Sequence, residues 1–293
     1  MGKALADAFP ICRETFEQAD AALGHPLSRI IFEGPEDQLT LTENTQPAIL
    51  TVSIAAYRLL ESRGLAPSFV AGHSFGEFSA NVAAGTLTFG DAVSIVQRRG
   101  RYMQEAVPVG AGAMAAILGL DVEQVADSCR ETAQGEVVSP ATMNGGGQVV
   151  IAGSAAAVAR AGEHAKARGA KRVIPLTVSA PFHCALMKPA EDRLAPELRA
   201  LKTQDPGIPV IADVDGEPKR DARSAIDALI AQVSSPVRWE AVVRRLASEG
   251  VTTYVEVGPG TVLSGLIRKI HREARVANFG SPDDLAAVED VMS

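Results

Sequence analysis

The sequence predicts an α/β fold in which a smaller α+β unit is inserted into a larger α/β body. Two patterns predict it: a strand, a sharp turn and a helix follow one another at residues 67–85, and residues 108–180 alternate strands and helices in a different order. A length of 293 residues suits one large or two modest domains, and a hydrophobic content of 46% provides a sizeable core.

Four segments build the first part of the body. Residues 47–62 predict a buried helix with Pro47 in its first turn, and residues 67–73 suit a short buried strand. A run of small residues at 77–85 indicates a closely packed helix after the turn. Residues 90–105 place apolar side chains at near-helical spacing with polar ones between them, so this helix has two distinct faces.

Residues 108–180 have the order strand, helix, strand, strand, helix, strand. This is the ferredoxin-like pattern, and it predicts a subdomain inserted between residues 1–107 and 181–293, which form the body. The glycines at 145–147 fit a hairpin turn rather than a phosphate loop that opens a helix. The body then continues with a helix near 185–202, a strand at 208–213, a helix near 222–233, a strand at 252–258 and a closing helix at 261–271.

Composition and charge argue against several classes of protein. Asp and Glu number 35 against 28 Lys and Arg, and the net charge of -7 disfavours nucleic acid or an anionic membrane as the main partner. Cys12, Cys129 and Cys184 are odd in number and far apart, which fits neither a disulfide framework nor a metal site. The sequence shows no export or lipid signal, and its apolar stretches fall short of the roughly 20 residues of a membrane span. We therefore expect a cytoplasmic protein.

Residues 72–76, Gly-His-Ser-Phe-Gly, match G-x-S-x-G. Small neighbours allow a strand-to-helix turn so tight that the serine hydroxyl projects from it. Ser74 is therefore a candidate nucleophile, and the backbone N–H of Phe75 at the helix N-terminus is a candidate oxyanion donor. The bare pattern also arises by chance, and a serine hydroxyl needs a base.

Five histidines are candidates for that base. His25, His164 and His271 lie in polar or charged segments typical of a surface, and His73 is on the wrong side of the turn to reach its neighbour's oxygen. His183 follows the last predicted strand of the subdomain in the apolar segment VSAPFHC. Taken alone, His183 is more simply interpreted as a satisfied core histidine.

Six segments along nearly the whole chain carry motifs that are more specific together than any one of them. They are GHSFGE at 72–77, RRGRYMQEAVPVGAGAMAAILGL at 98–120, NGGGQVVIAG at 144–153, APFHCALM at 180–187, SPVRW at 235–239 and EVGPGTVLSGL at 256–266. Together they resemble malonyl-CoA:acyl carrier protein transacylases. The resemblance implies the fold of that family, a hydrolase-like α/β body with a ferredoxin-like insert, which agrees with the element order above.

The resemblance implies a role for each matching residue. Ser74 would be the acylated nucleophile and His183 its base, oriented by the main-chain carbonyl of Gln232 instead of an Asp side chain. Arg99 matches the arginine that holds the malonyl carboxylate, and a guanidinium can bind a carboxylate through two parallel hydrogen bonds. Gln46 matches a glutamine that lines the same pocket.

Phe75, Phe182 and Met103 complete the implied substrate pocket, where the ring of Phe182 would leave no room for a branch on the acyl α-carbon. This preference is modest, since one methyl group changes affinity by about 1 to 3 kcal/mol. Asp213 and Asp215 have no His or further carboxylate at ligand spacing, so we expect a turn there rather than a metal site.

The start of the chain departs from the family pattern. Family members begin with a buried strand and a G-Q-G-S-Q loop, whose first glutamine supplies a second oxyanion N–H. Met1-Gly2 falls where a family Gly-Met-Gly would be. The resemblance therefore implies that the first family strand, and with it half of the expected oxyanion hole, is missing from the sequence as printed.

These features predict an acyltransferase that moves malonyl from malonyl-CoA to the phosphopantetheine thiol of an acyl carrier protein through a malonyl-serine intermediate. The resemblance implies no metal or redox cofactor and a role in fatty acid or polyketide biosynthesis. One alternative is a serine hydrolase or thioesterase, disfavoured by Arg99, which a neutral ester does not require. Another is a truncated, non-catalytic binding protein. We expect a monomer whose partners are malonyl-CoA and acyl carrier protein.

Two basic clusters are candidates for contact with a carrier protein, which in this family is typically acidic. They are Lys166, Arg168, Lys171 and Arg172 on the insert, and Arg268, Lys269 and Arg272 on the closing helix. A solvated surface is an equally good interpretation of either cluster taken singly.

Overall fold

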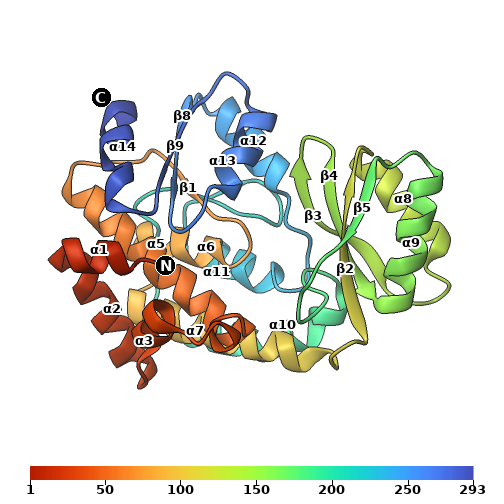
Figure 1. Ribbon diagram of the computed structural model, residues 1–293, viewed down its shortest axis with the longest axis horizontal. Helices are drawn as coiled ribbons and strands as arrows, with labels where there is room; N and C mark the ends of the chain where they lie inside the picture. The colour runs from red at the N-terminus through yellow and green to blue at the C-terminus, as the bar shows by residue number, and fades with distance from the viewer. Residues whose placement is uncertain (293) are drawn as a thin grey trace.

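The computed structural model describes residues 1–292 and has a larger and a smaller part that lie side by side (Figure 1). The larger part begins with helices that bury apolar side chains on one face, among them Leu5, Phe16 and Leu27. These helices are α1 (Lys3–Ala8), α2 (Pro10–Leu23), α3 (Leu27–Glu33), α4 (Glu36–Leu39) and α5 (Thr42–Ser62).

The predicted strand, turn and helix are present as β1 (Val70–Ala71) and α6 (Gly76–Ala83), followed by α7 (Phe89–Ala106). β1 pairs in parallel with β6 (Val210–Ile211), with Ala71 opposite Ile211. Parallel strands end at the same edge of a sheet, so the segments that follow β1 and β6 meet there. This edge holds the turn that carries Ser74.

The other elements of the larger part follow the insert. They are η1 (Ala185–Met187), α10 (Lys188–Ala200), β7 (Pro218–Lys219), α11 (Ala222–Ala231), α12 (Trp239–Ser248), β8 (Thr253–Val257), α13 (Val262–Ile270), β9 (Arg275–Phe279), η2 (Pro282–Asp284) and α14 (Leu285–Met292). β7 pairs antiparallel with β6, and β8 pairs in parallel with β9 in a second sheet. Helices α7, α10 and α11 share a core that includes Ile95, Leu194 and Leu229.

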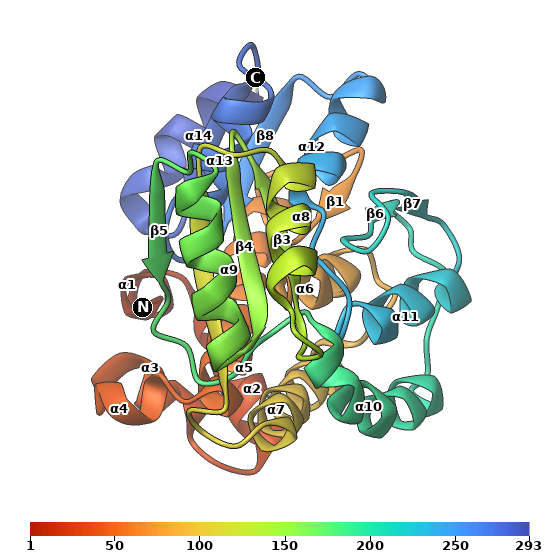
Figure 2. The same cartoon turned by 90° about the vertical axis from the view of Figure 1, so that its right-hand side faces the viewer.

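The smaller part is an antiparallel sheet of four strands in the order β3-β4-β2-β5. Numbered within the insert this order is 2-3-1-4, which is the ferredoxin-like arrangement, and α8 and α9 cover its outer face (Figure 2). Its elements are β2 (Gly112–Leu118), α8 (Val122–Thr132), β3 (Val138–Gly145), β4 (Gln148–Ser154), α9 (Ala155–Ala167) and β5 (Arg172–Pro175). The division of the chain at residues 107/108 and 180/181 stays a prediction.

Both faces of this sheet are buried, because successive side chains of a strand point to opposite faces. Ala115 and Ile117 of β2 belong to the core under α8 and α9. Met114 and Ala116 belong to a second core, which also contains Cys184 of the larger part. The inner face of the insert therefore packs against the segment that carries residue 183.

Two expectations about the body were wrong. Helix α5 begins at Thr42, where the carbonyl of Leu41 accepts the N–H groups of Asn44 and Thr45, so Pro47 lies inside the helix and not in its first turn. The helix at 262–270 does not close the chain either, because β9 and α14 follow it. The first turn of α5 and the short elements β9 and α14 show only weak periodicity in the sequence. Within residues 1–292, none of the helices has the length and apolar character needed to span a bilayer.

Candidate active site

Ser74 lies in the sharp turn between β1 and α6. Its φ of 55° is in the left-handed region, which costs a non-glycine residue about 1 to 3 kcal/mol. Gly72 permits this turn, because a Cβ there would lie 2.1 Å from the backbone carbonyl of Gly76. The N–H groups of Gly76 and Glu77 bond to carbonyls of the turn, whereas the N–H of Phe75 has no partner within the described chain. The Phe75 N–H is therefore free to bind an oxyanion.

His183 is placed by the junction between the insert and the body. Its neighbours Phe182 and Cys184 pack against the inner face of the insert sheet, and its own φ is 60°. The side chain is 4% exposed and its Nε2 lies 2.6 Å from the Oγ of Ser74. The Nδ1 lies 3.0 Å from the main-chain carbonyl oxygen of Gln232, which can only accept, so Nδ1 carries the proton and Nε2 is the acceptor. Ser74 and His183 thus have the arrangement expected of a nucleophile and its base.

Arg99 of α7 lies beside the nucleophile with 1% of its surface exposed. One terminal nitrogen donates to Oε1 of Gln46 at 2.8 Å, and the other donates to Oε1 of Gln232 at 3.0 Å and lies 3.4 Å from Oγ of Ser74. Its Nε is buried without a partner in the described part of the chain. Gly100 brings α7 this close to α5, since a Cβ there would lie 2.6 Å from the carbonyl oxygen of Thr42.

The side chain of Gln232 links Arg99 to two buried carboxyl groups. Its Nε2 lies 2.7 Å from Oε2 of Glu77, 3.2 Å from Oδ2 of Asp213 and 2.9 Å from the carbonyl oxygen of Ser74. Oδ2 of Asp213 also accepts the backbone N–H of Ser74 at 2.7 Å, and Oε2 of Glu77 accepts the N–H of Asp213 at 3.0 Å. The carboxyl groups lie beneath the turn and bind its backbone.

Burial shifts the pKa values of His183 and Arg99. Burial, and then the positive charge of Arg99, lowers the pKa of His183 from 6.5 to about 3, so the imidazole is neutral and able to accept a proton at physiological pH. Burial also lowers the pKa of Arg99 to about 10, opposed by the nearby charges of Asp213 and Glu77, so the guanidinium keeps its charge. The site therefore combines a neutral base with one buried cation.

The sequence matches the acyl transferase domain family over residues 1–284. The chain belongs to this family. It is 49% identical over 284 residues to the malonyl CoA-acyl carrier protein transacylase of Escherichia coli K12, covering 97% of this chain and 92% of that protein. The corresponding enzyme of Bacillus subtilis 168 is 48% identical over 288 residues, covering 97% of this chain and 90% of that protein.

Solved structures of acyl transferases superpose closely on this chain. The malonyl CoA-acyl carrier protein transacylase of Coxiella burnetii has a TM-score of 0.97 at 41% identity, covering 100% of this chain and 93% of that one. A malonyl-transacylase in complex with a type II polyketide synthase acyl-carrier protein has a TM-score of 0.95 at 45% identity, covering 98% and 94% of the two chains. The acyl transferase fold inferred from the motif order, an α/β body with a ferredoxin-like insert, is confirmed.

The acyl transferase site gathers most of the residues singled out in the sequence. Ser74, His183, Gln232, Arg99 and Gln46 form one connected set of contacts. Phe75 follows the nucleophile and Phe182 precedes the base, and both are half-buried. Met103 is 1% exposed in the core of the body, so its place in the substrate pocket stays a prediction.

The remaining histidines of this acyl transferase bond elsewhere. Nε2 of His73 lies 2.9 Å from Oδ1 of Asn144 in the insert, and His25, His164 and His271 pair with Gln97, Glu131 and Tyr254. Over the described residues, no group of three or more His, Cys, Asp or Glu side chains is placed to hold a metal ion.

Sequence reasoning missed two residues of the site, Glu77 and Asp213. The serine motif includes Glu77 but assigns it no role, and the sequence around Asp213 predicts only a turn. Asp213 does begin a turn, but its side chain is fully buried beneath Ser74. The signal that could have found it is its position two residues after the end of β6, the strand that pairs with β1.

Proposed function

We propose that the protein transfers a malonyl group from malonyl-CoA to the phosphopantetheine thiol of an acyl carrier protein through a covalent malonyl-Ser74 intermediate. One observation carries the substrate assignment: a buried guanidinium, with an unpartnered Nε and no carboxylate ion pair in the described chain, lies 3.4 Å from the nucleophilic oxygen. An acyl group attached to Ser74 would bring a malonyl carboxylate within reach of Arg99, and a bidentate pair would satisfy both.

The reaction has two steps, acylation of Ser74 and transfer of the acyl group to the carrier thiol. Oγ of Ser74 attacks the thioester carbonyl while Nε2 of His183 takes its proton, and the carbonyl of Gln232 stabilises the imidazolium through Nδ1. The oxyanion accepts the N–H of Phe75. The C–S bond then breaks, and the coenzyme A sulfur leaves with the proton from His183. In the second step the carrier thiol gives its proton to His183 and attacks the serine ester. The ester C–O bond then breaks, and His183 returns the proton to Oγ of Ser74.

The similar proteins support this assignment. Relatives at 45% to 49% identity are named malonyl CoA-acyl carrier protein transacylases, and one solved neighbour is bound to an acyl-carrier protein of a type II polyketide synthase. The pathway that this chain serves, fatty acid or polyketide synthesis, is decided by the carrier proteins it accepts.

Intact-mass measurement with malonyl-CoA tests the proposal. One malonyl group should add to the wild type and map to Ser74, and an added acyl carrier protein should remove it. Ser74→Ala should give no adduct, and His183→Ala should form it about 100- to 10,000-fold more slowly, the usual effect of losing a general base. An adduct on another residue would overturn the mechanism. Release of malonate without a carrier at the rate of transfer would identify a hydrolase instead.

We also propose a cytoplasmic location, supported by three buried free cysteines, which suit a reducing compartment. Cell fractionation with activity assays tests the location. Light scattering of the purified protein tests the predicted monomer.

A further inference from the structure

Glu77 and Asp213 form a carboxyl pair that the reaction scheme leaves unused. Glu77 on α6 is 1% exposed, and Asp213, after β6, is fully buried. The single Nε2 of Gln232 is within hydrogen-bond distance of an oxygen of each, so the two carboxyl groups lie close together. Two like charges at such a distance without water are strongly disfavoured.

The hydrogen-bond pattern shows where a proton would lie. Oε2 of Glu77 and Oδ2 of Asp213 accept hydrogen bonds from backbone and amide donors. Oε1 of Glu77 and Oδ1 of Asp213 are buried and have no donor within the described residues. A single proton on either group lets it donate a hydrogen bond to the other, since the two side chains lie within hydrogen-bond reach.

No positively charged group near the pair takes the place of that proton by bonding to either carboxyl group. Arg99 on α7 is the nearest buried cation, but its terminal nitrogens donate to Gln46 and Gln232 rather than to a carboxylate. Asp215 and Lys219, beyond Asp213, act on Glu77 with opposite signs and bond to each other at 2.5 Å. With one proton the pair carries a single negative charge, which balances Arg99.

The backbone of the nucleophile depends on this pair. Oδ2 of Asp213 holds the N–H of Ser74, whose left-handed conformation carries strain. Glu77 and Asp213 also fix the amide of Gln232, whose main-chain carbonyl orients His183. We propose that Glu77 and Asp213 share one proton and act as positioning residues that hold Ser74 and Gln232 in their reactive arrangement. The positioning role rests on the function proposed above, whereas the shared proton does not.

The pH dependence has a definite sign. Burial raises the pKa of Glu77 to about 7, and burial together with the charge of Glu77 raises the pKa of Asp213 well above its usual range. Between about pH 4 and 7 the native pair therefore holds a proton that the unfolded chain has lost. The free energy of unfolding should fall as the pH rises through this interval. Asp213→Asn should flatten that fall, because the amide donates to Glu77 without titrating.

Infrared spectroscopy of the full-length protein tests the shared proton directly. The C=O stretch of a buried protonated carboxyl group should be present in the wild type at pH 6 and absent from Asp213→Asn and Glu77→Gln. Asp215→Asn removes an exposed carboxylate from the same turn and should keep the band. Absence of the band from the wild type, or its persistence in both single variants, would disprove proton sharing.

Self-acylation by malonyl-CoA tests the positioning role. Asp213→Asn keeps an oxygen for the Ser74 N–H and should slow acylation less than Asp213→Leu does, whereas Asp215→Asn should leave the rate unchanged. Asp213→Leu removes that acceptor and should slow acylation about 10- to 100-fold, mainly in kcat, the effect of losing a hydrogen bond to a charged group. An unchanged rate in Asp213→Leu would refute the role. If Asp213→Leu does not fold, a large loss of rate in Asp213→Asn refutes it instead. Failure of the wild type to acylate would refute the proposed function, while the infrared result would still stand.

Discussion

Ser74 and His183 both have left-handed backbones, with φ near 60°, in a chain where most such positions are glycine. Each is held by neighbours from a distant part of the sequence: Asp213 binds the backbone of Ser74, and the insert sheet packs around His183. Strain of this kind persists only where surrounding contacts fix it, and it is concentrated at functional sites. The reactive atoms are therefore aligned before substrate arrives.

The low pKa of His183 predicts the acid side of the pH profile. A base with a pKa of about 3 stays neutral as the pH falls from 6.5 to about 5, where an ordinary histidine would become protonated and inactive. The kcat/KM for malonyl-CoA should therefore stay nearly constant over this interval. Steady-state kinetics in overlapping buffers measures it. A tenfold fall per pH unit below 6.5 would show that His183 titrates normally.

The buried guanidinium of Arg99 beside Ser74 predicts selectivity for a substrate with a free carboxylate. Arg99→Ala should weaken use of malonyl-CoA by roughly 2 to 5 kcal/mol in kcat/KM, since a malonyl carboxylate would then be buried without a partner. Acetyl-CoA carries no such group, so its use should be unchanged or improved. Parallel acylation assays with the two thioesters measure the ratio. An equal loss for both substrates would make Arg99 a structural residue.

At the scale of elements, close backbone packing decides which residues meet. β1 and β6 place Ser74 and Asp213 at the same sheet edge, and Gly100 lets α7 approach α5 so that Arg99 reaches Gln46. The tight turn between β1 and α6 requires Gly72. Small residues at these points set the geometry of the site without touching substrate.

Gly72→Ala tests the turn. The added Cβ would collide with the backbone of Gly76, so the free energy of unfolding should fall by about 1 to 3 kcal/mol or more and acylation of Ser74 should slow. Gly265→Ala on α13 is a matched control, because a Cβ there meets nothing within 4 Å. It should leave acylation intact and raise stability by up to about 1 kcal/mol, the gain in helix propensity. Urea unfolding and intact-mass kinetics measure both, and wild-type behaviour of Gly72→Ala would contradict the account of the turn.

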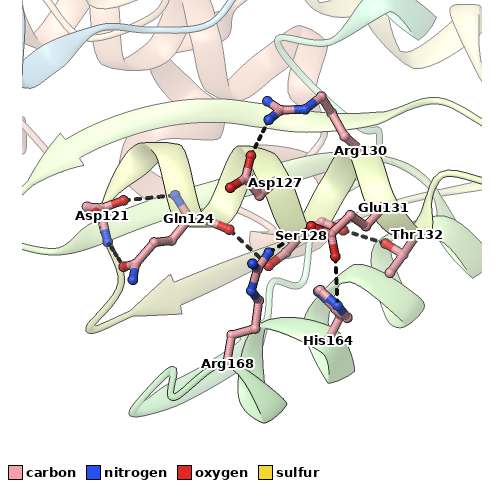
Figure 3. Close-up of polar contacts among 9 residues, drawn as sticks. All are labelled: Asp121, Gln124, Asp127, Ser128, Arg130, Glu131, Thr132, His164 and Arg168. Atoms are coloured by element: carbon pink, nitrogen blue, oxygen red, sulfur yellow. Dashed lines mark hydrogen bonds and ion pairs between the residues drawn. The ribbon is translucent and has the colours of Figure 1, made fainter.

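Over the whole molecule, the two basic clusters differ in their charge pairing. On the insert, Arg168 and His164 both bond to Glu131, and Arg130 bonds to Asp127 (Figure 3). Lys166 is paired with Glu163, whereas Lys171 and Arg172 of the same cluster form no ion pair within the described residues. Arg268, Lys269 and Arg272 near the end of α13 are exposed and form no ion pair in the described chain. The α13 cluster therefore leaves more positive charge free for an acidic partner.

Charge reversal tests this difference. Replacing Arg268, Lys269 and Arg272 with Glu should raise the KM for carrier protein about tenfold at low salt and less at high salt, because exposed charges act on encounter. The same change at Lys166, Arg168, Lys171 and Arg172 should have a smaller effect, since the charges of Lys166 and Arg168 are already paired. Self-acylation by malonyl-CoA serves as the control for folding. An unchanged KM after charge reversal on α13 would exclude α13 as the docking surface, and equal effects of the two clusters would contradict the expected difference between them.

Several features of the fold and of the candidate site could be predicted from local sequence patterns. The glycines of the serine turn and the order of strand and helix patterns over residues 108–180 are local features of the sequence, so the turn, the insert and the candidate nucleophile could be predicted. The motif order then implied His183, Arg99, Gln46 and Gln232. The strand β7 and the start of α5 before Pro47 could not be predicted, because a two-residue strand shows no periodicity and α5 begins without a side-chain cap.

The sequence by itself determined the fold class and indicated the candidate nucleophile and the residues that contact it. Only the tertiary structure decided which buried side chains hold Ser74 and Gln232 in place. Glu77 and Asp213 are 136 positions apart and carry no local pattern that links them. They become a pair because parallel strands β1 and β6 end at one sheet edge, and their burial there follows from packing around that edge. Desolvation and the distance between charges are properties of the folded chain, so the protonation of this pair and of His183 is decided only when the chain is folded.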